Sequence, residues 1–275
     1  MSKITPQLIG KTINALSYFQ PKLAAKFAVK LFSTPQKGKI TEDQRAFLNT
    51  AVHDTVNYKD IQIKTYLWGG SKDTVLLVHG WESNAFRWKD LIALLKAEDY
   101  NILAIDAPAH GDSSNKIFNA PMYSECISEV VKTYKPNVII GHSIGATASI
   151  IAQENHNLPS VEKNVLLGAP SNLAISVKNY ADFMGLNKKV RKAIDAYYLK
   201  YFKHLPSYYC AENFYKNNET QGIIIHDKKD KIISYREALD IKRHYKNAEL
   251  IKTQGLGHRL KSDAVCQHIL EFLKV

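Results

Sequence analysis

Cysteine is scarce in this 275-residue chain. The three cysteines, Cys126, Cys210 and Cys266, are odd in number, far apart and without a CxxC pair. This spacing excludes a disulfide framework and favours reduced thiols, so we expect a cytoplasmic protein. Histidines and carboxylates with the spacing of metal ligands are lacking, as is a glycine-rich phosphate-binding loop. We therefore expect neither a metal nor another cofactor.

Long apolar runs are also lacking. No uninterrupted apolar segment approaches the length that spans a bilayer. Lys11, Lys22, Lys26 and Lys30 interrupt the apolar N-terminal region, so a secretory signal is not expected. A hydrophobic content of 45% nevertheless suffices for a core, and the length suits one large α/β domain, with or without an insertion.

Negative charge is in deficit, because 37 Lys and Arg oppose 26 Asp and Glu for a net charge of +11. The excess is mostly lysine and is distributed along the chain. We interpret it as a solvated, lysine-rich surface, with attraction to anionic substrates or a membrane surface as the alternative. No nucleic-acid-binding motif accompanies the charge, so a nucleic-acid partner is not expected.

Residues 51–170 and 219–275 alternate between continuous apolar segments and helical periodicity. Strands are expected at 52–58, 61–68, 74–78, 101–105, 137–140, 164–167, 222–225 and 248–251. Helices are expected at 86–97, 120–134, 145–155, 234–245 and 260–273. This alternation predicts an α/β protein with a mostly parallel sheet of about eight strands, covered by helices on both faces. In such sheets, ligands bind beyond the carboxyl ends of the strands.

Two further regions are helical by their periodicity. Residues 1–50 form an N-terminal extension whose helices, with a break at Pro21, we expect to pack on the main domain. The alternative is an interfacial amphipathic anchor that gives weak membrane-surface association. Residues 171–218 form a helical insertion, a natural lid. Its basic run, 188–192, is interpreted as a solvated helix face, with attraction of an anionic substrate as the alternative.

The most informative motif is Gly141-His142-Ser143-Ile144-Gly145. It lies between an apolar strand and a helix-prone segment of small residues. This context predicts a nucleophile elbow, a sharp turn that exposes the Ser143 hydroxyl. The two glycines supply the small residues that such a turn requires.

A serine hydroxyl needs a base and an acid that orients the base. His258 lies in a glycine-rich loop after the last strand, where it can return to the elbow. Asp230 follows the preceding strand, and the resulting order Ser, Asp, His is the one expected for this elbow. Asp227 is the alternative acid, because it is closer to the strand end, although it can instead brace the loop.

An oxyanion intermediate also needs two backbone donors. One candidate is the amide of Ile144, directly after the nucleophile. The other is the amide of Trp81, in the loop His79-Gly80-Trp81-Glu82-Ser83 after the strand at 74–78. Gly80 permits the sharp turn of this loop.

Together these motifs resemble an α/β-hydrolase-fold serine hydrolase. The resemblance covers residues 51–275 and includes the H-G-x loop, the segment Asp106-Ala107-Pro108-Ala109-His110-Gly111-Asp112-Ser113, the elbow, the D-x-x-D segment and the final G-x-G-H. It implies that 171–218 is a cap over the pocket and that His79 and His110 brace loops. For His142, pocket lining and packing stay open. The proline that often follows the acid's loop is absent.

The predicted function is hydrolysis of carboxylic esters through an acyl-enzyme intermediate, acting on a small-molecule ester or a lipid-like substrate. The alternatives are a membrane-associated lysophospholipase or lipase, and a thioesterase or other acyl hydrolase. A non-catalytic binding protein on the same scaffold is disfavoured, because all three members of the Ser-His-Asp set are present.

Overall fold

The chain folds into two compact units in a computed structural model that describes residues 5–274. Unit 1 comprises residues 5–34 and 172–213, and unit 2 comprises residues 35–171 and 214–274. The sequence analysis placed the end of the N-terminal extension at residue 50. Its residues 1–4 lie outside the described part. The structure assigns residues 35–50 to unit 2, because the side chain of Leu48 is buried in the core beside the sheet.

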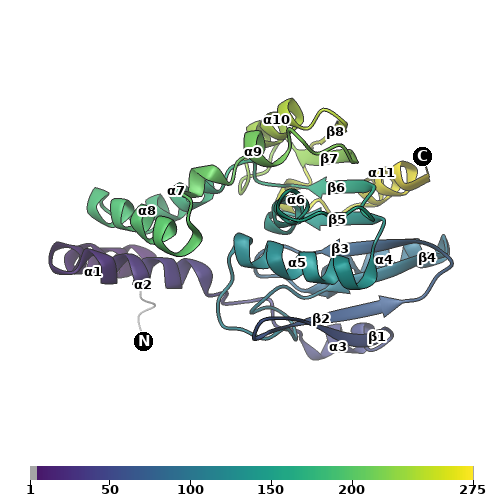
Figure 1. Cartoon of the computed structure of the whole chain (residues 1–275), viewed down its shortest axis with the longest axis horizontal. Helices are drawn as coiled ribbons and strands as arrows, with labels where there is room; N and C mark the ends of the chain where they lie inside the picture. Colours follow the sequence, from purple (N-terminus) through teal and green to yellow (C-terminus); the bar gives the residue numbers. More distant parts are fainter. Residues whose placement is uncertain (1–4, 275) are drawn as a thin grey trace. The chain divides into compact units, whose positions relative to one another are not determined.

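Unit 2 is built around a single eight-stranded sheet within the described residues (Figure 1). The strands are β1 (Val52–Tyr58), β2 (Ile61–Trp68), β3 (Lys72–Val78), β4 (Tyr100–Ile105), β5 (Val138–His142), β6 (Lys163–Leu167), β7 (Gln221–Asp227) and β8 (Ala248–Thr253). Their order is β1-β2-β4-β3-β5-β6-β7-β8, with β1–β2 and β2–β4 antiparallel and every other pair parallel. The predicted strand number and mostly parallel sheet are confirmed.

Both faces of this sheet are covered. The helices of unit 2 are α3 (Glu42–Leu48), α4 (Lys89–Ala97), α5 (Ala120–Tyr134), α6 (Ile144–Asn155), α10 (Tyr235–His244) and α11 (Asp263–Lys274). On β3, Val75 and Leu77 join a cluster with α4 and α11, whereas Leu76 and Val78 join a cluster with α5 and α6. Alternate residues of a strand point to opposite faces, so a continuous apolar strand indicates burial on both sides.

Unit 1 is helical. Its helices are α1 (Pro6–Phe19), α2 (Pro21–Ser33), α7 (Leu173–Phe183) and α8 (Lys188–Phe202), and α9 (Ala211–Phe214) begins within it. The break expected at Pro21 is present, because proline begins α2 at a position where its missing N–H is not needed. The alanine-rich face of α2 (Ala24, Ala25 and Ala28) is buried in one cluster with α8. The sequence analysis assigned this packing to the main domain, whereas the structure buries these faces inside unit 1.

Among the described helices, each is too short or too polar to cross a lipid bilayer.

Candidate active site

The turn between β5 and α6 holds Ser143 in a strained conformation. Its φ of 54° and ψ of −132° lie outside the usual regions for a residue with a side chain. A Cβ on Gly141 would collide with the backbone of Ala146, and one on Gly145 would collide with the carbonyl of His79. The motif therefore uses glycine at both ends because no space exists for a larger residue. Ser143 thus occupies a sharp turn between β5 and α6, at the position where the sequence analysis expected a nucleophile elbow.

The loops after β7 and β8 bring an imidazole and a carboxylate to this serine. His258 Nδ1 lies 2.7 Å from Asp230 Oδ2, and His258 Nε2 lies 3.0 Å from Ser143 Oγ. A carboxylate only accepts hydrogen bonds, so Nδ1 is the donor and Nε2 is left to accept the serine proton. The structure thus joins three side chains that are far apart in the sequence into one hydrogen-bonded line.

Asp230 is held as an ionised acceptor. Burial favours its neutral form, but hydrogen bonds from His258 and from the amides of Ile232 and Ile233 outweigh burial and lower its pKa. The carboxylate therefore remains charged at neutral pH and can stabilise positive charge on His258.

Asp227, the alternative acid, has a different set of partners. Its carboxylate accepts from the Lys229 amide, the Leu256 amide and the Thr253 hydroxyl at 2.8–2.9 Å. Burial opposes its ionisation, but these hydrogen bonds prevail and lower its pKa to about 2. Asp227 thus links the loop after β7 to the loop after β8, the bracing alternative of the sequence analysis.

The loop after β3 lies directly against the elbow. A Cβ built on Gly80 would be 2.9 Å from both Ser143 Cβ and the His142 carbonyl oxygen, so only glycine allows this approach. The next backbone amide, that of Trp81, belongs to the same peptide plane as the Gly80 carbonyl. In a trans peptide the N–H and C=O point in opposite directions. A hydrogen bond to the Gly80 carbonyl oxygen therefore also fixes the direction of the Trp81 N–H.

His79 holds that carbonyl. Its Nδ1 donates to the Gly80 oxygen at 2.7 Å, while its Nε2 accepts from the Ala107 amide at 2.9 Å. His110 acts on the other side of Trp81, where its Nε2 accepts from the Glu82 amide at 3.0 Å. Hydrogen bonds thus fix the backbone on both sides of Trp81. Among the described residues, neither the Trp81 nor the Ile144 amide donates a backbone hydrogen bond, so both are available to a bound group.

A family comparison agrees with this arrangement. The model of the alpha/beta hydrolase family matches residues 75–219, which is more than half of the chain. The chain belongs to the alpha/beta hydrolase family. The family resemblance and the fold class inferred from the sequence are therefore confirmed.

Individual relatives are more distant. A serine hydrolase-like protein of Danio rerio is 34% identical over 95 residues, which cover 32% of this chain and 29% of that protein. A pimeloyl-[acyl-carrier protein] methyl ester esterase of Neisseria meningitidis is 26% identical over 136 residues, covering 49% of this chain and 50% of that enzyme. These alignments therefore span half or less of the relatives' own lengths.

Solved structures show the same fold at low sequence identity. An esterase of Pyrococcus furiosus superimposes with a TM-score of 0.66 at 19% identity, over 88% of this chain and 98% of that one. The mouse alpha/beta hydrolase domain-containing protein 10 also gives a TM-score of 0.66, at 14% identity, over 82% and 97% of the two chains.

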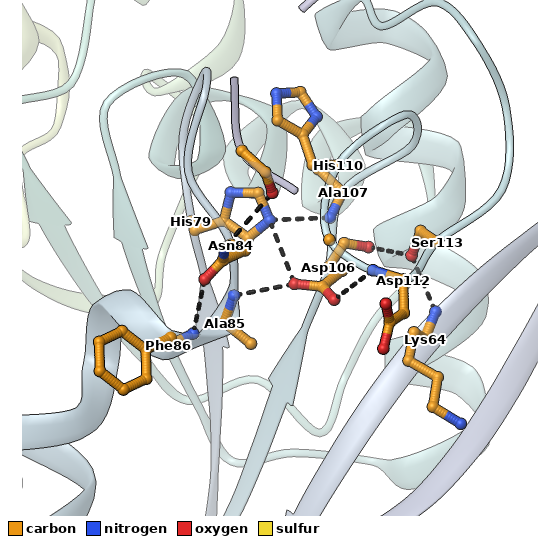
Figure 2. A network of polar contacts seen from close by, with 12 residues as sticks. Lys64, His79, Asn84, Ala85, Phe86, Asp106, Ala107, His110, Asp112 and Ser113 are labelled. Carbon is orange, nitrogen blue, oxygen red and sulfur yellow. Dashed lines mark hydrogen bonds and ion pairs between the residues drawn. The ribbon is translucent and has the colours of Figure 1, made fainter. Parts of the chain in front are cut away.

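The sequence analysis gave no role to Asp106, which holds the loop after β3 through the Ala85 amide. This fully buried carboxylate accepts from the amides of Ala85 and Asp112 and from the Tyr66 hydroxyl at 2.7–2.9 Å. Figure 2 shows the carboxylate between His79, in the loop after β3, and Asp112. The motif that begins at Asp106 was the available sequence signal, but it does not show which groups the carboxylate binds.

The sequence analysis left the part of His142 open between pocket lining and packing. Its Nε2 donates to the carbonyl of His258 at 2.8 Å, and burial holds its pKa well below the usual value. The neutral ring therefore ties the elbow to the loop that carries the base. Arg87 supports the same loop, with its guanidinium 2.6 Å from the Arg259 carbonyl. Neither interaction has a sequence signature, because both acceptors are backbone oxygens.

The two bracing histidines predict a pH-dependent stability. Burial lowers the pKa of His79 and of His110 to about 4, against an ordinary value of about 6.5. Below pH 6.5 these histidines bind protons in the unfolded chain but remain neutral in the folded chain. Their contribution to the free energy of unfolding is therefore full above pH 6.5 and declines as the pH falls toward 4. We expect each histidine to contribute at most about 3 kcal/mol to this decline. Urea unfolding at pH 7.5 and pH 4.5 measures it.

A His110→Gln variant is the matched comparison. Its amide oxygen can still accept from the Glu82 amide, but it does not titrate, so the decline in stability between pH 7.5 and pH 4.5 should become smaller. An equally steep dependence in this variant would contradict the assignment to His110.

Proposed function

We propose that this alpha/beta hydrolase cleaves carboxylic esters through an acyl-enzyme intermediate. The observation that carries the proposal is the continuous line from Ser143 Oγ through His258 to Asp230, with separations of 3.0 and 2.7 Å. Its ends are a hydroxyl on a strained turn and an ionised carboxylate. This is the arrangement that converts a weakly nucleophilic hydroxyl into an effective one.

The first step is attack of Ser143 Oγ on the ester carbonyl. The hydroxyl proton moves to His258 Nε2, and the charge developing on the carbonyl oxygen is stabilised by the Trp81 and Ile144 amides. Asp230 keeps the imidazole in the required tautomer and stabilises its positive charge. Collapse of the intermediate breaks the bond to the alcohol oxygen, which takes the proton from His258. An acyl ester on Ser143 remains.

The second step is hydrolysis of that acyl-enzyme. His258 removes a proton from water as the water oxygen attacks the acyl carbonyl, and the proton then passes to Ser143 Oγ as the acid leaves. The same two amides stabilise this second oxyanion. Each such donor contributes about 10²–10³ to turnover in acyl-transfer enzymes.

Carboxylic esters are the proposed substrate class because relatives include an esterase that acts on a methyl ester. The testing experiment combines a fluorophosphonate probe with p-nitrophenyl esters of graded acyl length. The probe should modify Ser143 alone, as located by peptide mass spectrometry, and the ester series should report the acyl length that the protein accepts. A folded protein that neither reacts with the probe nor cleaves any ester would refute the proposal.

A further inference from the structure

The positive charge of the protein is concentrated in one unit. The two segments that form unit 1, residues 5–34 and 172–213, contain eleven Lys and Arg but three Asp and Glu, so unit 1 accounts for +8 of the net +11. The first 41 residues contain no acidic residue. Lysines are distributed along the chain, as the sequence analysis noted, but most of the net positive charge belongs to this helical unit because unit 2 balances its lysines with acids.

Unit 1 also contains a groove between the α1–α2 turn and α8. Its volume is about 850 Å³, and all of its lining residues belong to unit 1. Its apolar walls include Phe19, Leu23, Tyr197 and Tyr201, of which Phe19 is 87% exposed. Large exposed apolar side chains that gather at one groove mark a surface that a partner covers.

Lysines surround these apolar side chains. Lys22, Lys26 and Lys192 line the groove, and none of them forms an ion pair among the described residues. The lining contains no acidic side chain. Asp182, one of the three acids of unit 1, is already paired with Lys178 and Arg191. The groove thus combines uncompensated positive charge with exposed apolar surface.

We propose that this face of unit 1 docks on an anionic phospholipid bilayer, with Phe19 and Leu23 inserted at the interface and the lysines on the headgroups. An apolar face flanked by lysines is what interfacial binding requires. A nucleic-acid duplex, whose bases are stacked inside, would satisfy the lysines but not the exposed apolar side chains. The neutral surface of a zwitterionic membrane would satisfy the apolar side chains but not the lysines. The proposal does not depend on the hydrolase mechanism.

The test is co-sedimentation with vesicles of phosphatidylglycerol and phosphatidylcholine, compared with phosphatidylcholine alone. We expect binding only to the anionic vesicles, and weaker binding at high salt because the Debye length shrinks. A K22E/K26E/K192E variant should lose at least about 100-fold in affinity, since each lysine near an anionic surface contributes about fivefold. The Ser143→Ala protein serves as the host, so lipid hydrolysis cannot alter the vesicles.

The matched control is K216E/K246E/K252E, which makes the same change in net charge with exposed lysines of unit 2. It should retain most of the binding. Phe19→Ser provides a second variant that leaves the charge intact and removes an exposed side chain, and we expect about a tenfold loss. Equal losses in the two lysine variants, binding to lysophosphatidylglycerol monomers but not to vesicles, or absence of binding would each overturn the proposal.

Discussion

A Ser143→Ala variant is expected to lose about 10⁴–10⁶ in kcat for a p-nitrophenyl ester. The reason is that, among the described residues, Ser143 supplies the hydroxyl that lies 3.0 Å from His258 Nε2, and no other hydroxyl contacts that nitrogen. Steady-state hydrolysis under substrate saturation measures the effect. Since Ser143 is 9% exposed and alanine is smaller, the variant should fold normally.

The control for this experiment is the thermal unfolding midpoint. Alanine keeps the Cβ that makes a positive φ unfavourable, so the backbone strain at this position is unchanged and the midpoint should change little. A Ser143→Ala protein that keeps more than a few per cent of the activity would show that hydrolysis occurs elsewhere.

Asp230→Asn should lower kcat by about 10⁴ while the protein stays folded. An amide in place of the carboxylate can donate to His258 Nδ1, and this favours the tautomer with the proton on Nε2. That tautomer cannot accept the proton of Ser143. The loss should therefore appear in kcat more than in KM, and single-turnover acylation rates measure it directly.

Asp227→Asn is the comparison that separates the two acids. It places an N–H₂ group among donors from Thr253, Leu256 and Lys229, so at least one hydrogen bond is lost. We expect a decrease of about 1–3 kcal/mol in the free energy of unfolding and a much smaller decrease in kcat. If Asp227→Asn abolished turnover and Asp230→Asn did not, the roles of the two residues would be reversed.

The sequence predicted the sheet well because its physical determinants are local. A strand whose residues are all apolar is stable only when helices bury both of its faces, and the segment at 74–78 shows this arrangement. Its residues Leu76 and Val78 belong to one side-chain layer, whereas Val75 and Leu77 belong to the other. Helix 120–134 was predicted at its observed bounds, where Asn119 caps it and a left-handed residue ends it. The elbow was equally accessible, since its glycines are required by space.

Features that depend on tertiary partners were not accessible in the same way. The preference for Asp230 over Asp227 rested on position alone. Two acids three residues apart differ mainly in their hydrogen-bond partners, and these partners are known only from the folded structure. The part of Asp106 required knowledge that Tyr66, Ala85 and Asp112 converge on it. The packing of the first helices was missed because an apolar helix face does not specify its partner.

Unit 1 is assembled from two segments of the chain, 5–34 and 172–213, and this has a consequence for evolution and engineering. The alanine-rich face of α2 shares its buried cluster with α8, which is encoded far downstream. A gene that lost its first thirty codons would leave α8 with an uncovered apolar face, and its product should aggregate rather than persist as a shortened protein. Exchange of this unit between relatives therefore requires two coordinated recombination events, and natural variation in either segment should be accompanied by compensating change in the other.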